Sequence, residues 1–284
     1  IVKAKDPEVK TVFIGPCIAK RKEATYHDNV DYVMTFEELQ AVFNGKEIEI
    51  NTEKHASEVL DALSKDFKIA SIEEKEKITI YGDYDVDGVT SASLLYLYLT
   101  SLGADVYIKI PKREGEGYGV SSPAIQTIAE SGATLIITVD TGITANAEVD
   151  FAAGLGVDFV ITDHHECHGD LPGAVAVVNP HRPDCPYPFK ELAGVGVVFK
   201  TVCACEMRRC ERLGNSVIDG VRRVCSKYAD LVAVGTIADV MPIVDENRLI
   251  VALGLKMISE TERKGLAALI DAVTMKNESS SKSP

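Results

Sequence analysis

The chain has 284 residues, of which 46% are hydrophobic and 26% are charged, and its formal net charge is −13. This composition is typical of a soluble globular protein that is long enough for two or three structural units. The acidic total argues against a broad basic face for non-specific binding of duplex DNA, although an acidic site turns positive once it holds metal ions. No apolar stretch approaches the roughly 18–20 residues of a membrane span, and no signal peptide is visible. The seven cysteines form no C-x-x-C pair, so we expect reduced thiols and a cytoplasmic protein.

The first fifty residues predict a small α/β fragment. Residues 11–15 are typical of a short strand, and Thr35 with Glu38 three residues later has the capping-box spacing of a helix start. A polar linker follows through about residue 54, and the apolar spacing over residues 59–67 indicates another helix. We therefore place one unit at residues 1–50 and a second unit at residues 51–273.

The second unit alternates strands and helices from residue 77 onward. Apolar runs predict strands at 77–83, 105–110, 134–140, 157–162 and 174–179, with helices near 89–102, 122–131 and 145–154. Continuous apolar strands that alternate with helices predict an α/β fold with a mostly parallel sheet and helices on both faces. Residues 190–273 are mostly helical in this interpretation, as segments 190–213, 216–239 and 248–273, and residues 274–284 form a disordered tail.

Three aspartates, Asp83, Asp85 and Asp87, directly follow the first of these strands. Ligands of α/β sheets bind beyond the carboxyl ends of the strands. If the backbone stays extended, the three side chains point one way with neighbours about 6–7 Å apart. That gap can bracket two metal ions about 3.5–4 Å apart, and Thr90 or Ser91 would then cap the next helix. A calcium loop is disfavoured, because a strand precedes the cluster and the twelfth position is a leucine.

Other strand and helix ends carry further candidate ligands. Asp140 ends a strand and could bridge two metals, and Asp163-His164-His165 ends the next. Adjacent histidines on a strand do not face one point, so we expect one to bind metal and the other to bind phosphate or support a neighbour. Asp239 ends an apolar helix, where the helix dipole disfavours an anion unless a cation is present. Together these residues predict a two-metal site for phosphoryl-transfer chemistry.

These motifs, with Asn179-Pro-His-Arg182, resemble in order and spacing the DHH phosphoesterases over about residues 55–273. The branch they resemble most is the RecJ family of single-strand-specific 5′→3′ DNA exonucleases. The resemblance implies single-stranded DNA as substrate, two Mn²⁺ or Mg²⁺ ions, and hydrolysis by a metal-activated water. It implies metal ligands at five positions: Asp85, Asp87, Asp140, His164 and Asp239. It implies catalytic roles close to the metals or the scissile phosphate for Asp83 and His165, and substrate binding by His181 and Arg182.

Two elements of that family are missing from the sequence. The Gly-Gly-His phosphate-binding motif of the DHH-associated domain does not occur in these residues, and we expect no OB-fold domain. We therefore expect impaired turnover of long DNA strands. Two alternatives stay open: a phosphodiesterase for short oligonucleotides or cyclic dinucleotides, and an inactive metal-binding or redox-sensing fusion fragment.

The N-terminal unit carries a different resemblance. Pro16-Cys17, with Lys20 and Glu23 at intervals of three, and the segment 31–39 resemble a fragment of the iron-only hydrogenase catalytic domain. That resemblance implies Cys17 as an iron–sulfur ligand. One thiolate does not hold a four-iron cluster, so we expect no hydrogen chemistry. A functional fusion and a recombined reading frame both remain interpretations of this segment.

Overall fold

The computed structural model describes residues 12–15, 32–35, 76–112 and 119–280. The chain divides into two compact units, Ile1–Ser57 and Glu58–Pro284. In the first unit, β1 (Val12–Gly15) pairs in parallel with β2 (Tyr32–Thr35). The strand expected at residues 11–15 is therefore present, and β2 is a strand that the sequence did not indicate. The two helices expected before residue 70, and Cys17, lie outside the described residues.

The second unit is built on a five-stranded parallel sheet, which confirms the predicted fold class. Its strands lie in the order β4-β3-β5-β6-β7, and every neighbouring pair is parallel. All their carboxyl ends therefore meet at one edge. The strands are β3 (Lys77–Gly82), β4 (Asp105–Lys109), β5 (Leu135–Val139), β6 (Asp158–Thr162) and β7 (Ala176–Val178).

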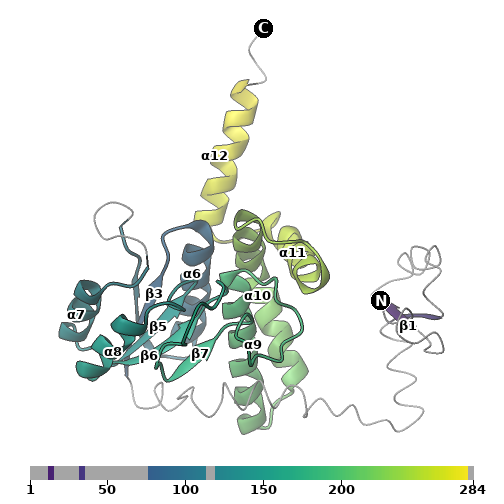
Figure 1. The fold of residues 1–284 in the computed structure, drawn as a ribbon. Helices are drawn as coiled ribbons and strands as arrows, with labels where there is room; N and C mark the ends of the chain where they lie inside the picture. The colour runs from purple at the N-terminus through teal and green to yellow at the C-terminus, as the bar shows by residue number, and fades with distance from the viewer. Residues whose placement is uncertain (1–11, 16–31, 36–75, 113–118, 281–284) are drawn as a thin grey trace. The chain divides into compact units, whose positions relative to one another are not determined.

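Helices cover both faces of this sheet (Figure 1). On one face, Tyr81, Ile136 and Phe159 pack with the apolar residues of α7 (Ser122–Glu130) and α8 (Asn146–Gly154). On the other face, Ile80 and Ile137 pack with three helices. Adjacent residues such as Ile136 and Ile137 enter opposite cores, because side chains alternate along a strand. The three helices are α6 (Val86–Ser101), α9 (Gly194–Leu213) and α10 (Val217–Ala238).

The end of the chain contains two helices where the sequence predicted one over 248–273. They are α11 (Asp245–Ile258) and α12 (Lys264–Ser280). Polar residues separate them, and Arg263 donates from Nε to the buried Asp230 of α10 over 2.5 Å, which fixes the entry to α12. Because α12 runs to Ser280, residues 274–280 of the expected disordered tail are helical. Among the described residues, no helix is long and apolar enough to cross a membrane.

Candidate metal centre

The first acidic cluster begins a helix instead of continuing the strand. Asp85 is the N-cap of α6, and its side chain accepts a hydrogen bond from Gly88 N over 2.9 Å. The prediction that the three aspartates form an extended row was therefore wrong. The predicted helix cap at Thr90 or Ser91 was also wrong, because the Asp85 cap starts the helix at Val86. Helical rotation carries Asp87 away from Asp83, and both side chains are buried.

Asp140 follows β5 in an unusual backbone conformation. Its φ is 58°, in the left-handed region that few residues other than glycine adopt, and the residue is only 2% exposed. Aspartate tolerates this region better than most residues, but the conformation still costs of order 1 kcal/mol. Its Oδ1 accepts no well-aligned hydrogen bond from the described residues, although His164 Nε2 lies 3.2 Å away. A buried, strained and under-paired carboxylate of this kind is typical of a ligand-binding position.

Asp163 holds the histidine pair at the end of β6. It accepts hydrogen bonds from Ile143 N (2.9 Å), His164 N (2.7 Å) and His165 N (3.2 Å). The His165 ring donates a fourth bond from Nδ1 over 2.7 Å. Burial alone would raise the pKa of Asp163, but these bonds outweigh it and the pKa is lowered. The bond to Asp163 also raises the pKa of His165. Asp163 is thus an ionised support that orients His165, a role that the sequence did not assign.

The two histidines both reach Asp140, contrary to the expectation for neighbours on a strand. One ring nitrogen of each lies within 4.8 Å of an Asp140 oxygen and of the other. The ring centroids are 4.7 Å apart and the planes are tilted by 56°. The alternation of side chains does not hold here, because β6 ends at Thr162 and the chain turns away from the sheet.

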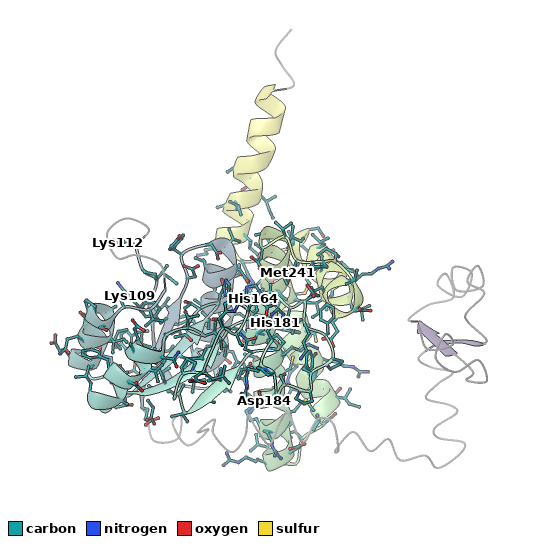
Figure 2. All side chains as sticks on the ribbon, in the orientation of Figure 1. Lys109, Lys112, His164, His181, Asp184 and Met241 are labelled. Carbon is teal, nitrogen blue, oxygen red and sulfur yellow. The ribbon has the colours of Figure 1, made fainter. Side chains whose placement is uncertain are left out.

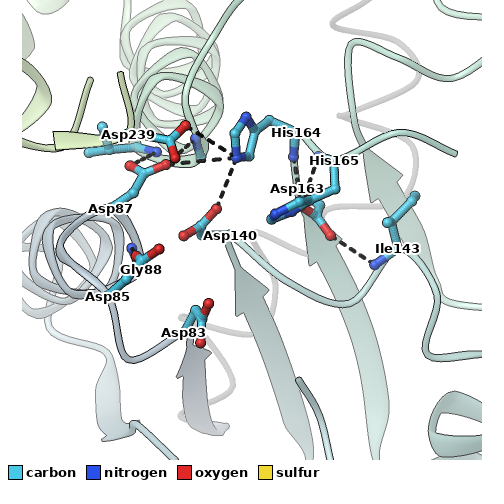
Figure 3. Close-up of polar contacts among 12 residues, drawn as sticks. Asp83, Asp85, Asp87, Gly88, Asp140, Ile143, Asp163, His164, His165 and Asp239 are labelled. Atoms are coloured by element: carbon cyan, nitrogen blue, oxygen red, sulfur yellow. Dashed lines mark hydrogen bonds and ion pairs between the residues drawn. The ribbon is translucent and has the colours of Figure 1, made fainter. Parts of the chain in front are cut away.

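His164 lies among three carboxylates (Figure 3). Its Nε2 is 3.2 Å from Asp140, 3.7 Å from Asp239 and 3.9 Å from Asp87. Burial would lower the pKa of His164, but these carboxylates raise it to about 9. Burial raises the pKa of Asp140 to about 7 and that of Asp87 to about 6, and it also raises the pKa of Asp239. The cluster therefore holds more negative charge than its own imidazole offsets.

The first turn of α9 holds Asp87 from the opposite side. Gly194 N donates to Asp87 Oδ2 over 2.6 Å, and Val195 N donates to Asp87 Oδ1 over 2.9 Å. A Cβ atom on Gly194 would lie 2.6 Å from the Asp140 side chain, so a glycine is needed for this close approach. The sequence analysis assigned no role to Gly194, and this contact supplies one.

Three overlapping groups of side chains could each hold a cation. Within each group the ligand atoms lie within 4.8 Å of one another. One group is made of carboxylates alone and the other two add one or two imidazoles; carboxylate oxygens suit Mn²⁺ and Mg²⁺, and the unoffset negative charge favours a cation. The donor set therefore fits divalent ions. The groups are Asp83, Asp85 and Asp140; Asp87, His164 and Asp239; and Asp140, His164 and His165.

The expected phosphate ligands lie between β7 and α9, where Figure 2 labels His181 and Asp184, and their side chains contact other groups of the protein. Arg182 donates to Asp184 from Nε (3.0 Å) and Nη2 (2.6 Å), and from Nη1 to Val177 O (2.5 Å). His181 Nδ1 lies 3.0 Å from Glu166, and its Nε2 lies 2.9 Å from Lys190 O. Substrate binding by His181 and Arg182 therefore stays a prediction.

Comparison with known families places most of the chain in one of them. Residues 77–236 match the DHH family, N-terminal domain. Residues 1–107 match the C-terminal domain of the iron-only hydrogenase large subunit. That second match covers less than half of the chain and overlaps the first from residue 77, so the hydrogenase-like fragment at 1–50 stays a prediction.

Several curated relatives that match this chain are named as exonucleases. The single-stranded-DNA-specific exonuclease RecJ of Bacillus subtilis (strain 168) is 50% identical over 200 residues, which are 70% of this chain and 24% of the relative. RecJ of Escherichia coli (strain K12) is 37% identical over 70% of this chain and 35% of the relative. This chain thus spans about a quarter to a third of the length of these curated relatives.

Solved structures agree with this assignment. A crystal structure of exonuclease RecJ bound to manganese has a TM-score of 0.64 and 37% identity, covering 75% of this chain and 51% of that one. RecJ from Thermus thermophilus in complex with Mn²⁺ has a TM-score of 0.60 and 34% identity, covering 75% and 29%. With the parallel sheet, the acidic edge and the match over residues 77–236, the chain belongs to the DHH family.

Proposed function

We propose that this chain hydrolyses phosphodiester bonds of single-stranded DNA from the 5′ end, using two Mn²⁺ or Mg²⁺ ions. The observation that carries the proposal is the convergence of five aspartates and two histidines at the carboxyl edge of the sheet. Divalent ions bound there would neutralise the phosphate, lower the pKa of the attacking water and stabilise the leaving oxygen. Relatives that match this chain are named single-stranded-DNA-specific exonucleases, which supports the choice of substrate.

We assign the roles that the family resemblance implies to residues within these groups. Asp85, Asp87, Asp140, His164 and Asp239 are the proposed metal ligands, and Asp140 belongs to two of the three groups. Asp83 lies in the group with Asp85 and Asp140, so it can accept a hydrogen bond from water near the metals. His165 Nδ1 lies 2.7 Å from Asp163, which orients the ring, and we assign this residue a role close to the scissile phosphate.

The amides of α9 fix the Asp87 carboxylate, and each oxygen keeps a further lone pair for a cation. The carboxylate therefore does not need to reorient when a metal binds. This preorganisation is what the first turn of α9 contributes to the site.

We also propose that the chain degrades long single strands slowly. The cationic group nearest in sequence to the histidine pair, Arg182, is already bound to Asp184 and to a backbone carbonyl. Phosphate binding would have to compete with these contacts. The six described cysteines are free thiols, which agrees with a reducing compartment, and we propose the cytoplasm.

The test is a degradation assay on the purified 284-residue chain with EDTA, Mg²⁺ or Mn²⁺. We expect metal-dependent release of nucleotides from 5′-labelled single strands, little release from duplexes, and none from Asp140→Asn. Asp105→Asn is the matched control, because Asp105 is an exposed aspartate at the amino end of β4, the edge of the sheet opposite the site. Hydrolysis of dinucleotides and cyclic dinucleotides alone would support the alternative substrate class. Substoichiometric metal binding without any hydrolysis would refute the enzymatic proposal.

A further inference from the structure

The turn after Asp239 has a backbone conformation that its own side chains do not explain. Val240, the next residue, has a φ of 58°, in the left-handed region that β-branched residues rarely adopt. Its side chain is 87% exposed, so packing around that side chain does not impose the conformation. A strained backbone persists only where the surrounding structure fixes it. Contacts farther along the chain must therefore help to hold Asp239 in place.

The side-chain amide of Asn247 supplies such a contact. Asn247 lies in the first turn of α11 and is only 2% exposed. Its Nδ2 donates to Pro242 O over 3.0 Å and to Glu191 O over 2.5 Å. Both hydrogens of the amide group are used, and two carbonyl acceptors require that the nitrogen, not the oxygen, faces them. Two segments that are distant in sequence therefore meet at one buried side chain.

The two carbonyls belong to segments that carry groups of the metal centre. Pro242 is three residues after Asp239. Glu191 leads into α9, whose first amides hold Asp87. Asp87 and Asp239 belong to the same candidate cation group, of which Asn247 is not a member. Asn247 therefore acts on this group through the backbone of both segments.

α11 is a fixed support for the amide. Glu246, the neighbour of Asn247, accepts a hydrogen bond from the Tyr187 hydroxyl over 2.7 Å and pairs with Lys200 Nζ of α9 over 2.5 Å. A Cβ atom on Gly254 would collide with the backbone of α10, so α11 packs closely on that helix (Figure 1). Because α11 is held by both helices, the two bonds from Asn247 fix the segments that they reach.

We propose that Asn247 is a positioning residue that holds Asp239 beside Asp87 in the metal centre. The proposal rests on the proposed function, because it assigns a role within the same site. Loss of the two donors leaves two buried carbonyls unpaired and lets the strained turn at Val240 relax. Asp239 then shifts away from the cation that it shares with Asp87.

The effect should be confined to one cation. Asp83, Asp85 and Asp140 form a separate group at the ends of β3 and β5 and at the start of α6. The bonds from Asn247 reach none of these elements. Selective weakening of one ion therefore distinguishes a positioning role from a general loss of stability.

The experiment titrates the full chain and its variants with Mn²⁺ by calorimetry and records the electron paramagnetic resonance spectrum of the loaded protein. Asn247→Asp keeps the shape of the side chain but has no N–H donor for the two carbonyls. We expect its affinity for one ion to fall about ten- to hundredfold, as for other groups that orient metal ligands, and its affinity for the second ion to be unchanged. The spectrum should lose the signal of two coupled Mn²⁺ ions. Asn247→Ala removes the donors without adding a charge and should give the same loss, which covers the case that Asn247→Asp does not fold.

Three further variants serve as controls. Asn146→Asp is the matched one, because Asn146 is exposed and its Nδ2 also donates to a backbone carbonyl, that of Asp170, over 3.3 Å; it should bind both ions like the wild type. Arg263→Gln removes the partner of the buried Asp230, so it should lower the unfolding midpoint and still bind both ions. Asn247→Gln keeps both donors on a longer side chain and should recover part of the lost affinity.

The outcomes separate this inference from the proposed function. Wild-type binding of both ions by Asn247→Asp, equal weakening of both ions, or selective loss of one ion in Arg263→Gln would overturn the positioning role. A wild-type chain that binds no Mn²⁺ would instead refute the proposed function. In that case hydrogen exchange of the Met241 amide, which donates to Thr236 O over 3.2 Å, decides the inference without metal. Exchange there should be faster in Asn247→Asp, and an unchanged rate would overturn the inference on its own.

Discussion

Replacing Asp140 with asparagine should stabilise the metal-free protein while removing its metal binding. Asparagine has the same shape as aspartate and tolerates the left-handed backbone at φ 58°. The folded protein raises the pKa of Asp140 to about 7 from the ordinary 3.8, chiefly by burial. A tenfold change in proton affinity is about 1.4 kcal/mol, so ionised Asp140 costs the folded state on the order of 4 kcal/mol. The attraction to His164 is already contained in this pKa, so we expect asparagine to stabilise the metal-free protein by up to about 4 kcal/mol above neutral pH.

The pH dependence of the gain follows from the direction of the pKa change. When the pKa of a carboxyl is raised in the folded state, the free energy of unfolding falls as the pH rises from the pKa of the unfolded state to that of the folded state. The advantage of Asp140→Asn should therefore be absent below about pH 4, grow between about pH 4 and 7, and stay constant above about pH 7. Urea unfolding in EDTA at about pH 5 and about pH 8 measures it, and calorimetric titration with Mn²⁺ should show loss of binding.

Asp163→Asn is the matched control, because Asp163 is equally buried but its pKa is lowered. An amide NH₂ at Oδ2 would face the Ile143 N–H, donor against donor. This variant should lose about 2 kcal/mol at about pH 8, as expected for hydrogen bonds to a charged group. If Asp140→Asn is the less stable of the two in EDTA, or binds Mn²⁺ like the wild type, the reasoning about the cluster is wrong.

Three further results should follow from the same contacts. Mn²⁺ binding at neutral pH should release protons, because the pKa of His164 is about 9 without metal; equal calorimetric enthalpies in phosphate and Tris buffers would contradict this. Gly194→Ala should lower Mn²⁺ affinity about ten- to hundredfold by displacing Asp140, whereas Gly196→Ala, whose Cβ would meet only Leu192 at 3.3 Å, should have a smaller effect. Glu206→Gln should lower the free energy of unfolding by about 2 kcal/mol at neutral pH. Burial would raise the pKa of Glu206, but Arg209 and Arg223 lower it overall, so the loss should become smaller as the pH falls and the wild-type carboxylate is protonated.

The sheet could be predicted from sequence because its strands are continuous apolar runs between helices. The expected strand at 134–140, for example, is β5 over Leu135–Val139. The conformation after β3 could not be predicted, because Asp85 can either continue a strand or cap a helix, and the cap depends on a local hydrogen bond from Gly88. The support of Asp87 by α9 could not be predicted either, since Gly194 is 107 residues away in the sequence. Motif spacing identified which side chains gather at the edge, whereas tertiary contacts decide how each is held.

The charge imbalance of the site predicts a last effect, that metal stabilises the fold. Carboxylates with raised pKa values surround one imidazole, so a bound cation relieves repulsion that the folded chain otherwise carries. A ligand that binds only the folded state adds about 2.7 kcal/mol at a hundredfold excess over its Kd. Mn²⁺ should therefore raise the thermal midpoint of the wild type but leave that of Asp140→Asn unchanged. Without metal the wild type should have the lower thermal midpoint of the two, since the same carboxylate that binds the cation destabilises the empty site. An equal shift in both proteins would show that Mn²⁺ acts elsewhere on the chain.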